Sequence, residues 1–195
     1  MYRVLLATLS ELCTQEIPPE LKSAAPSGAR HNSWLAGRLL LNRVISPLPE
    51  IVYGDQGKPA FAGDLPLWFS LSHSGDHIAL LVSDEGEVGC DIEVIRPRNN
   101  WRSLANAVFS QAEHREIERE HPAQQLDAFW RIWTRKEAII KHRGGSAWEI
   151  VSVDSCNPLN LHLSHSHRAG LSLAVCTPTS FTLAADQIES VGEEK

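Results

Sequence analysis

An acidic pair in a short apolar segment is the clearest candidate for chemistry in this sequence. Residues 89–95 read GCDIEVI, so Asp91 and Glu93 stand two positions apart among apolar neighbours. Because side chains alternate along a β-strand, both carboxylates point to one face and Cys90 and Ile92 point to the other. Two anions this close repel unless water, protonation or a cation relieves them, and hard oxygen ligands suit magnesium. Taken alone, the pair fits the solvated outer face of a half-buried strand better than a metal site.

A third carboxylate lies on the apolar side of a predicted helix over residues 123–142. Apolar residues recur there at steps of three and four, and Glu137 continues the stripe that includes Trp130 and Trp133. A carboxylate aimed at the core needs a partner. Lys141, four residues on, could supply one as an ordinary helix ion pair. Alternatively, Glu137 is a third ligand for a cation held by the acidic pair, and Lys141 faces an anionic substrate.

Positive charge is concentrated on the same helix. Residues 131–143 contain one acid, Glu137, and five cations, which are Arg131, Arg135, Lys136, Lys141 and Arg143. This excess predicts a surface that meets something anionic, with a merely solvated helix face as the alternative.

Two further segments carry groups that suit phosphate. Lys58 lies in a Gly-Lys-Pro turn, and Ser72 and His73 precede Gly75 at the end of a predicted strand. Each segment alone also fits a structural role, Lys58 as a plain turn lysine and His73 as a hydrogen-bonded histidine.

The elements that must position these residues are mixed along the chain, which predicts an α+β fold. Hydrophobic periodicity and breakers indicate helices over 34–45, 110–121 and 123–142, and strands over 4–9, 67–71, 77–83, 88–95, 151–153, 159–163 and 171–176. The turn between 77–83 and 88–95 predicts a hairpin. Ser110 and Glu113 have the spacing of a capping box, and Gly144 supplies a helix stop.

The chain also divides into two similar halves, for which we expect a boundary at Pro97: residues 1–97 and residues 98–195. The string Leu-Ser-His-Ser precedes an apolar strand at 71–74 and again at 163–166. In the helices, Trp34 is followed four residues later by Arg38, as Trp133 is by Glu137. We therefore expect two pseudo-symmetric halves, each with a small, mainly antiparallel sheet packed on a long helix.

Bulk composition restricts the class of protein. The 195 residues are 43% hydrophobic and 22% charged, as expected of a folded globular chain. A formal net charge of -6 argues against a nucleic-acid binder that relies on a general basic field. Without a signal-peptide layout or ~20 consecutive apolar residues, we expect no membrane association and a cytoplasmic protein. The scattered cysteines predict reduced, small core residues: Cys13, Cys90, Cys156 and Cys176.

A transition-metal site is a different hypothesis for the second half. His162, His165 and His167 lie near Cys156 and Cys176 in the sequence. Alternation along a strand sends His162 and His165 to opposite faces, which weakens this hypothesis.

Together the motifs resemble the 4'-phosphopantetheinyl transferases. The motifs appear in that family's order and approximate spacing: GKP at 57–59, LSHSGD at 71–76, GCDIE at 89–93 and WTRKEAIIK at 133–141. The resemblance spans nearly the whole chain and is closest to the long, Sfp-type branch, in detail to the enterobacterial AcpT-type holo-[acyl-carrier-protein] synthases. It implies that family's fold, with the active site in the cleft between the halves.

The resemblance also implies roles for these residues. Coenzyme A would lie in the cleft, with its pyrophosphate on a magnesium ion held by Asp91, Glu93 and Glu137. Its phosphates would contact Lys58, Ser72, His73 and Lys141, and Arg38 would face the same cleft. The serine of an apo acyl carrier protein would attack the β-phosphorus and release adenosine 3',5'-bisphosphate, with Glu137 or a metal-bound water beside it as base. We expect a monomer.

The sequence departs from the family pattern at Tyr53, where some relatives use an arginine on coenzyme A. We expect that contact to be missing or supplied by Arg30 or Arg43. The alternative function is a carrier-protein-binding homologue with little transferase activity. For docking an acidic carrier protein, two basic regions compete: residues 131–143, or the arginines at 96, 98 and 102.

Overall fold

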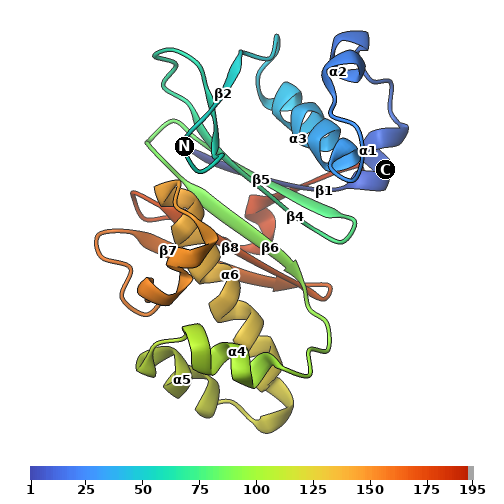
Figure 1. The fold of residues 1–195 in the computed structure, drawn as a ribbon. Helices are drawn as coiled ribbons and strands as arrows, with labels where there is room; N and C mark the ends of the chain where they lie inside the picture. The colour runs from blue at the N-terminus through green and yellow to red at the C-terminus, as the bar shows by residue number, and fades with distance from the viewer. Residues whose placement is uncertain (193–195) are drawn as a thin grey trace.

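Two small sheets stack between two long helices in the computed structural model, which describes residues 1–192 (Figure 1). The α-helices are α1 (Leu9–Thr14), α2 (Pro19–Ala24), α3 (His31–Val44), α4 (Trp101–Val108), α5 (Gln111–Glu118) and α6 (Gln125–Arg143). The strands are β1 (Tyr2–Thr8), β2 (Ile51–Tyr53), β3 (Pro59–Phe61), β4 (Trp68–Ser74), β5 (His77–Ser83), β6 (Gly89–Val94), β7 (His162–Arg168), β8 (Leu171–Thr177) and β9 (Ile188–Val191). Short 3₁₀ helices occupy Pro122–Gln124, Ala147–Ser152 and Ala185–Gln187.

The two main sheets have the same strand order apart from β9, a fourth strand that only the first sheet contains. In the first, the β4–β5 hairpin joins β1 through antiparallel pairing of β5 with β1. In the second, the β7–β8 hairpin joins β6 in the same way through β8. A long helix follows the first strand of each set, α3 after β1 and α6 after β6. This repetition confirms the predicted pseudo-symmetric α+β fold with small antiparallel sheets.

The alternation of side chains along β1 and β5 places the first sheet between two apolar cores. Leu5 and Leu80 point into a core shared with α3, whereas Val4 and Leu81 point into a core shared with the second sheet. Strands buried on both faces read as continuous apolar runs, as β5 does.

Helix α6 is buried by two different partners along its length. Its first half, including Phe129 and Trp130, packs with α4 and α5. Its second half, including Ile139 and Ile140, packs on the second sheet. The capping box that starts α5 and the left-handed Gly144 that ends α6, at φ +64°, are both as predicted.

The predicted hairpin between residues 77–83 and 88–95 is wrong. Both strands form, but β5 pairs with β1 and β4, while β6 pairs with β8 in the other sheet. The turn between them is therefore a crossing from one sheet to the next. The sheets accordingly divide between β5 and β6 rather than at residue 97, and β9 returns to the first sheet beside β1.

Two predictions near the end of the chain also need correction. Residues 151–153 do not form a strand, because the capping box of Ser146 and Glu149 starts a 3₁₀ helix there. The strand predicted over 159–163 lies at 162–168 instead. All four cysteines are free, as predicted, but only Cys90 and Cys176 are part of the core, since Cys13 is half-buried and Cys156 is exposed. None of the helices within residues 1–192 has the length and apolar character that crossing a lipid bilayer requires.

Candidate active site

Strand β6 directs the acidic pair toward helix α6. Cys90 and Ile92 point into the core between the sheets, so Asp91 and Glu93 occupy the opposite face, as predicted. Asp91 is only 4% exposed. A solvated outer face, the simpler interpretation of the pair, is therefore wrong for Asp91.

A glycine allows α6 to cross β6 at close range. A Cβ added to Gly89 would lie 2.0 Å from the carbonyl oxygen of Ala138 and 2.4 Å from the backbone nitrogen of His142. Any side chain here would push the helix away from the strand. The close approach is what brings Glu137 and Lys141 to the acidic pair.

The three carboxylates influence one another electrostatically. Burial raises the pKa of Glu137 to about 7, and repulsion from Asp91 and Glu93 contributes, with Lys141 acting in the opposite sense. Burial likewise raises the pKa of Glu93, against a hydrogen bond from Ser74 that lowers it. The site therefore concentrates negative charge in a poorly hydrated place.

Lys141 neutralises part of this charge. Its Nζ donates to Oδ1 of Asp91 and to Oγ of Ser72, each at 2.7 Å, and its side chain is 31% exposed. Burial is the largest single influence and acts to lower the pKa of Lys141, but the opposing contributions of Asp91, Cys90 and Glu137 together raise it. Among the ion pairs of residues 1–192, none joins Lys141 to Glu137, so the simple helix pair is wrong.

The donor set suits a divalent cation. Oδ2 of Asp91 is a buried carboxylate oxygen without a hydrogen-bond partner. Hard carboxylate oxygens with unrelieved mutual repulsion are the ligands that magnesium accepts. The described part of the chain contains no group of three acidic, histidine or cysteine side chains already gathered at metal-binding distance. The three carboxylates thus have the chemistry that suits magnesium. Within the described residues they are not drawn close enough together to form a complete metal site.

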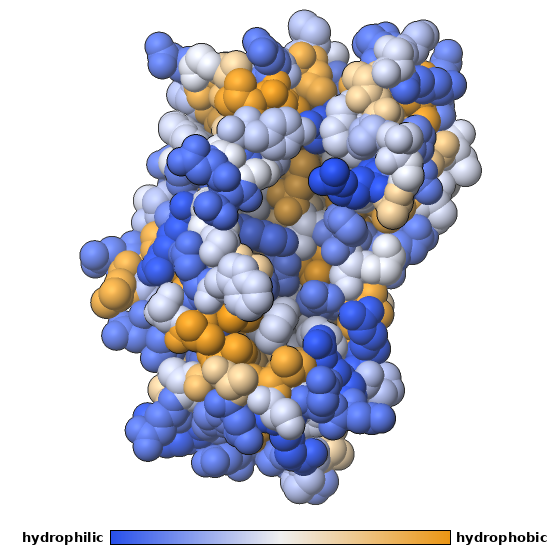
Figure 2. Space-filling view, viewed as in Figure 1, coloured by the Kyte–Doolittle hydropathy of each residue, from blue (hydrophilic) through white to orange (hydrophobic). Residues whose placement is uncertain are grey.

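Two cavities flank this centre, and Leu71 of β4 lines both. The first, of about 430 Å³, is lined by residues of α3, the β2 end and β4, among them Arg30, Trp34, Arg38, Tyr53, Ser72 and His73. The second, of about 320 Å³, is lined from the other side by residues that include Lys58, Glu137, Lys141, Gly144 and Ala147. Every residue predicted to bind substrate therefore lines one of the two cavities. Figure 2 shows that the face containing α3 and α6 is hollowed between its upper and lower parts.

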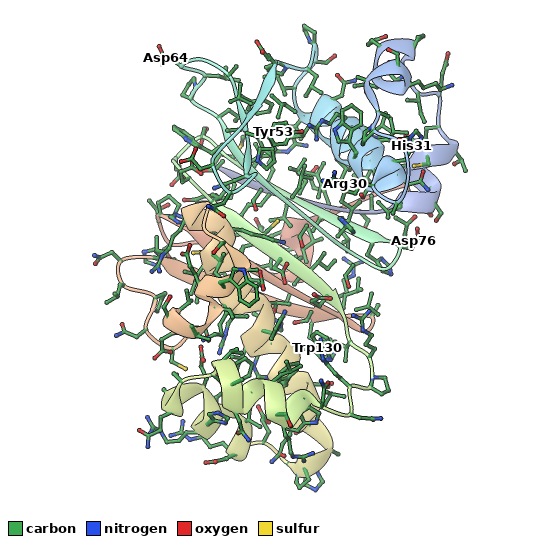
Figure 3. The ribbon with its side chains drawn as sticks, in the orientation of Figure 1. Arg30, His31, Tyr53, Asp64, Asp76 and Trp130 are labelled. Carbon is green, nitrogen blue, oxygen red and sulfur yellow. The ribbon has the colours of Figure 1, made fainter. Side chains whose placement is uncertain are left out.

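Arg38 is held rigidly in the first cavity. It is 7% exposed, its guanidinium carbon lies 4.5 Å from the centre of the Trp34 ring, and it donates a hydrogen bond to the Tyr53 hydroxyl. Arg30 is exposed and lines the same cavity (Figure 3). Arg43 lies elsewhere and donates to Gln15. Of the two arginines considered as substitutes at Tyr53, only Arg30 is in place.

Lys58 and Ser72 already form several hydrogen bonds within the protein. The Lys58 ammonium donates to Oε2 of Glu87 and to two backbone carbonyls, those of Val88 and His142. The Ser72 hydroxyl donates to Asp91 and accepts from the Ile92 amide and from Lys141, which fills its capacity for hydrogen bonds. His73 lines the first cavity, and part of its side chain is exposed to solvent. Partial burial of its ring is the main cause that lowers its pKa, and the charge of Lys141 acts in the same sense.

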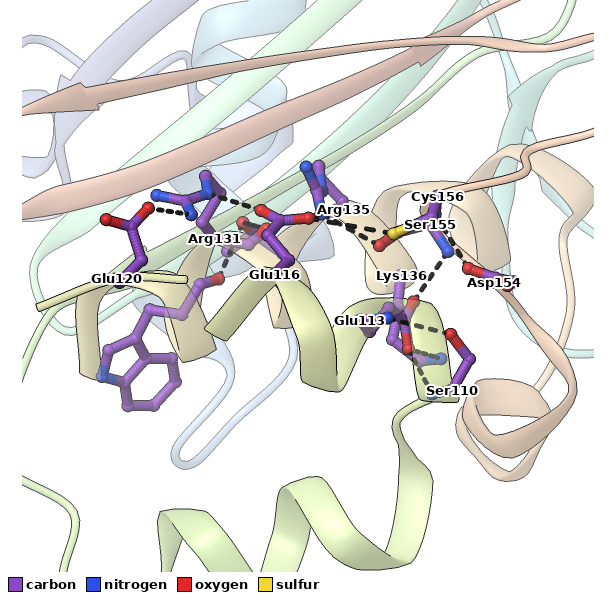
Figure 4. Close-up of polar contacts among 12 residues, drawn as sticks. Ser110, Glu113, Glu116, Glu120, Arg131, Arg135, Lys136, Asp154, Ser155 and Cys156 are labelled. Atoms are coloured by element: carbon purple, nitrogen blue, oxygen red, sulfur yellow. Dashed lines mark hydrogen bonds and ion pairs between the residues drawn. The ribbon is translucent and has the colours of Figure 1, made fainter. Parts of the chain in front are cut away.

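The basic surface expected on residues 131–143 is largely absent. Lys136 is fully buried and donates to Glu113, which also accepts from the Ser110 and Ser155 amides (Figure 4). Arg131 and Arg135 both pair with Glu116 of α5, and Arg131 also pairs with Glu120 just beyond that helix (Figure 4). The helical period accounts for this, because Lys136 shares its stripe with Ile132 and Ile139.

The alternative basic region is free of acidic partners. Arg96 and Arg98 lie 5.8 and 5.7 Å from the Trp130 ring, and Arg102 lies 4.4 Å from the Trp101 ring. None of these arginines forms an ion pair with another residue of the 1–192 segment. The region adjoins the site, since the charge of Arg96 acts on Glu93.

The histidines of β7 do not form a metal centre. His165 shares a hydrogen bond with Ser172 at 2.8 Å, and burial, reinforced by Arg135 and Arg131, lowers its pKa to about 4. No histidine and cysteine group within the described chain could hold an ion. The transition-metal hypothesis is therefore unsupported.

Sequence reasoning missed Ser74 of β4, which donates a 2.7 Å hydrogen bond to Oε2 of Glu93. The available signal was the alternation of Ser70, Ser72 and Ser74 on one face of an otherwise buried strand.

Known proteins with similar sequences show the family of this chain. Residues 87–184 match the family model of the 4'-phosphopantetheinyl transferase superfamily. A relative from Escherichia coli K12, the 4'-phosphopantetheinyl transferase AcpT, is 65% identical over 189 residues, which is 97% of each chain. The chain belongs to the 4'-phosphopantetheinyl transferase superfamily.

Two further relatives have a slightly higher and a much lower sequence identity to this chain. The AcpT of Salmonella typhimurium is 67% identical over 188 residues, 96% of this chain and 98% of its own. A Bacillus subtilis 4'-phosphopantetheinyl transferase is 36% identical over 90 residues, 46% of this chain and 39% of its own. The chain is accordingly a phosphopantetheinyl transferase, and β6, α6 and the β7–β8 hairpin all lie within the segment that matches the family model.

Proposed function

We propose that this transferase moves the 4'-phosphopantetheine group from coenzyme A to a serine of an apo acyl carrier protein in a magnesium-dependent reaction. The observation that carries the proposal is the meeting of Asp91, Glu93, Glu137 and Lys141 between two cavities, one of them lined by arginines and aromatic rings. A diphosphate spanning the two cavities would lie beside these four residues.

In this proposal Asp91, Glu93 and Glu137 hold the magnesium ion. When bound, the ion neutralises charge on the diphosphate of coenzyme A and relieves repulsion among the carboxylates. Lys141 complements the developing negative charge, since its side chain is partly exposed while its Nζ is anchored to Asp91.

Glu137 is the proposed base. In its ionised form this carboxylate can accept a proton from an alcohol as the alcohol attacks. The serine oxygen forms a bond to the β-phosphorus as its proton passes to Glu137. The bond from that phosphorus to the bridging oxygen breaks, and adenosine 3',5'-bisphosphate leaves with the electron pair.

The first cavity is proposed to take the nucleotide portion of coenzyme A. Arg30 and His73 offer exposed contacts for its phosphates, and Trp34 and Tyr53 offer aromatic faces. Arg38 supports this wall from behind, because its guanidinium is buried against Trp34 and Tyr53. Lys58 and Ser72 keep their predicted contacts with coenzyme A only if it displaces one of their present partners.

For the acidic carrier protein we favour docking on Arg96, Arg98 and Arg102. Within residues 1–192 these cations form no ion pair and lie over aromatic rings, whereas those of residues 131–136 are paired with acids or buried. Charge on an open surface of this kind steers an oppositely charged partner.

The test is transfer itself. Purified protein is incubated with coenzyme A, Mg²⁺ and a panel of apo carrier proteins, and each carrier is weighed by mass spectrometry. We expect a gain of one phosphopantetheine group on at least one carrier, lost with EDTA and absent from a carrier whose acceptor serine is alanine. If no carrier in the panel gains mass while several bind the protein, the non-catalytic carrier-binding function replaces the proposal.

A further inference from the structure

Three serines of β4 join the two sheets where the halves meet. The side-chain oxygens of Ser70, Ser72 and Ser74 accept hydrogen bonds from the backbone amides of Cys90, Ile92 and Val94, at 3.0, 3.2 and 3.1 Å. Backbone groups of β4 do not pair with β6 in either sheet. The serine hydroxyls thus replace the missing backbone ladder along this edge of β6.

Because each serine oxygen accepts a hydrogen bond from a backbone amide of β6, its hydroxyl proton must point to another acceptor. A serine hydroxyl has one proton to donate, and in Ser74 it goes to Oε2 of Glu93 at 2.7 Å while the oxygen accepts from Val94. Ser74 is 8% exposed, so water competes little for this bond. A hydroxyl donated to a carboxylate is a charge-assisted bond of the stronger kind.

We infer that Ser74 is a positioning residue that holds one oxygen of Glu93 and leaves the other for the divalent cation. The inference rests on the proposed function, because it assigns Glu93 to the metal. Without Ser74 the carboxylate would rotate freely and, under repulsion from Asp91, spend less time facing the ion. Hydrogen bonds that orient a metal-binding carboxylate in this way typically contribute about 10- to 100-fold to metal affinity.

Ser70 is the matched control. It belongs to the same row of serines, accepts from β6 in the same way and is 3% exposed. Its hydroxyl is bonded to no carboxylate in the described chain. Ser70→Ala therefore removes one junction hydrogen bond without touching a proposed ligand.

The experiment compares metal binding in Ser74→Ala, Ser74→Thr and Ser70→Ala. Mn²⁺ serves as the probe, its binding to the full-length protein in the presence of coenzyme A is measured by electron paramagnetic resonance, and thermal melts monitor folding. We expect Ser74→Ala to weaken Mn²⁺ binding about tenfold or more, Ser74→Thr to restore it, and Ser70→Ala to change it less than about twofold. In activity assays the same loss should appear in the KM for Mg²⁺, with kcat retained at saturating metal.

Two results separate failure of this inference from failure of the proposed function. If the wild-type protein binds Mn²⁺ and Ser74→Ala binds it as tightly as Ser70→Ala does, the positioning role is overturned and the metal site stands. If the wild-type protein itself binds no Mn²⁺ with coenzyme A present, both are overturned. Ser74→Cys, which conserves volume but donates weakly, replaces the alanine variant if that variant does not fold.

Discussion

The two halves of this transferase share one architecture and use it differently. Each consists of a first strand, a long helix and a hairpin, and each hairpin begins with a strand that carries Leu-Ser-His-Ser. At the corresponding helix position the first half has Arg38, buried against aromatic rings at the first cavity. The second half has Glu137, raised in pKa beside two more carboxylates. In the proposed function, the first half contributes the wall of the nucleotide cavity and the second half contributes the oxygen ligands.

The two Leu-Ser-His-Ser strings show why only one of them belongs to the site. In β4, Ser72 and Ser74 bond the carboxylates of β6, and His73 is exposed in a cavity. In β7, Ser164 accepts from the Leu183 amide and His165 is bonded to Ser172. The same residues become structural where no acidic strand lies opposite. The proposed chemistry draws on both halves, because β4 of the first half supplies the serines that bond the carboxylates of the second.

Removing the charge at the two equivalent helix positions, Glu137 and Arg38, should have the largest effect on activity. Glu137→Gln removes a proposed base and metal ligand, so kcat should fall about 10²- to 10⁴-fold in the carrier-labelling assay. Arg38→Gln, its counterpart in the first half, should instead raise the KM for coenzyme A about tenfold with a smaller change in kcat. Full activity of Glu137→Gln would contradict the assignment.

Gly89 and Gly37, the two glycines at helix–strand contacts, should differ sharply in how well each tolerates substitution by alanine. Gly89→Ala places a methyl group 2.0 Å from a backbone oxygen of α6, so unfolding free energy should drop by about 3 kcal/mol or more, measured by urea denaturation. In the first half, a Cβ on Gly37 meets the flexible end of Leu71 at 3.2 Å. Gly37→Ala should cost about 1 kcal/mol or less. Equal losses in the two variants would refute the close crossing of α6 and β6.

Stability in the absence of Mg²⁺ should depend on pH through Glu137. Its pKa rises from an ordinary 4.5 to about 7 on folding, so the folded chain holds a proton that the unfolded chain releases. Stability therefore falls as pH rises from about 4.5 to about 7. Glu137→Gln, which cannot ionise, should match the wild-type Tm near pH 4 and exceed it at pH 8. A Tm difference that is the same at both pH values would mean that Glu137 is not buried among like charges.

The smallest effects should distinguish the two histidines. His73→Ala should raise the KM for coenzyme A about 2- to 10-fold, since it removes an exposed contact from the first cavity. His165→Ala should leave that KM unchanged and lower the Tm, because His165 bonds Ser172 inside its own half. A change in KM from His165→Ala would show that the second half contributes its own copy of the motif.

Local pattern predicted much of the fold correctly. The capping box at Ser110 and the stop at Gly144 follow from short-range hydrogen bonding, which the sequence contains in full. The hairpin predicted for β5 and β6 failed because a turn between two strands fits a crossing between sheets as well as a hairpin. The basic surface predicted at Lys136 is wrong because this lysine lies on the apolar stripe of its helix, beside Ile132 and Ile139.

The sequence by itself determined which side chains share a face, since the two-residue repeat of a strand and the 3.6-residue repeat of a helix are properties of the backbone. That was enough to align Asp91 with Glu93 and to place Glu137 and Lys141 one turn apart. Only the tertiary structure decided that β6 pairs with β8, that α6 crosses it at Gly89, and that β4 supplies serines from the other half. Those contacts join residues far apart in the chain, and their selection depends on apolar burial summed over both sheets rather than on any local motif.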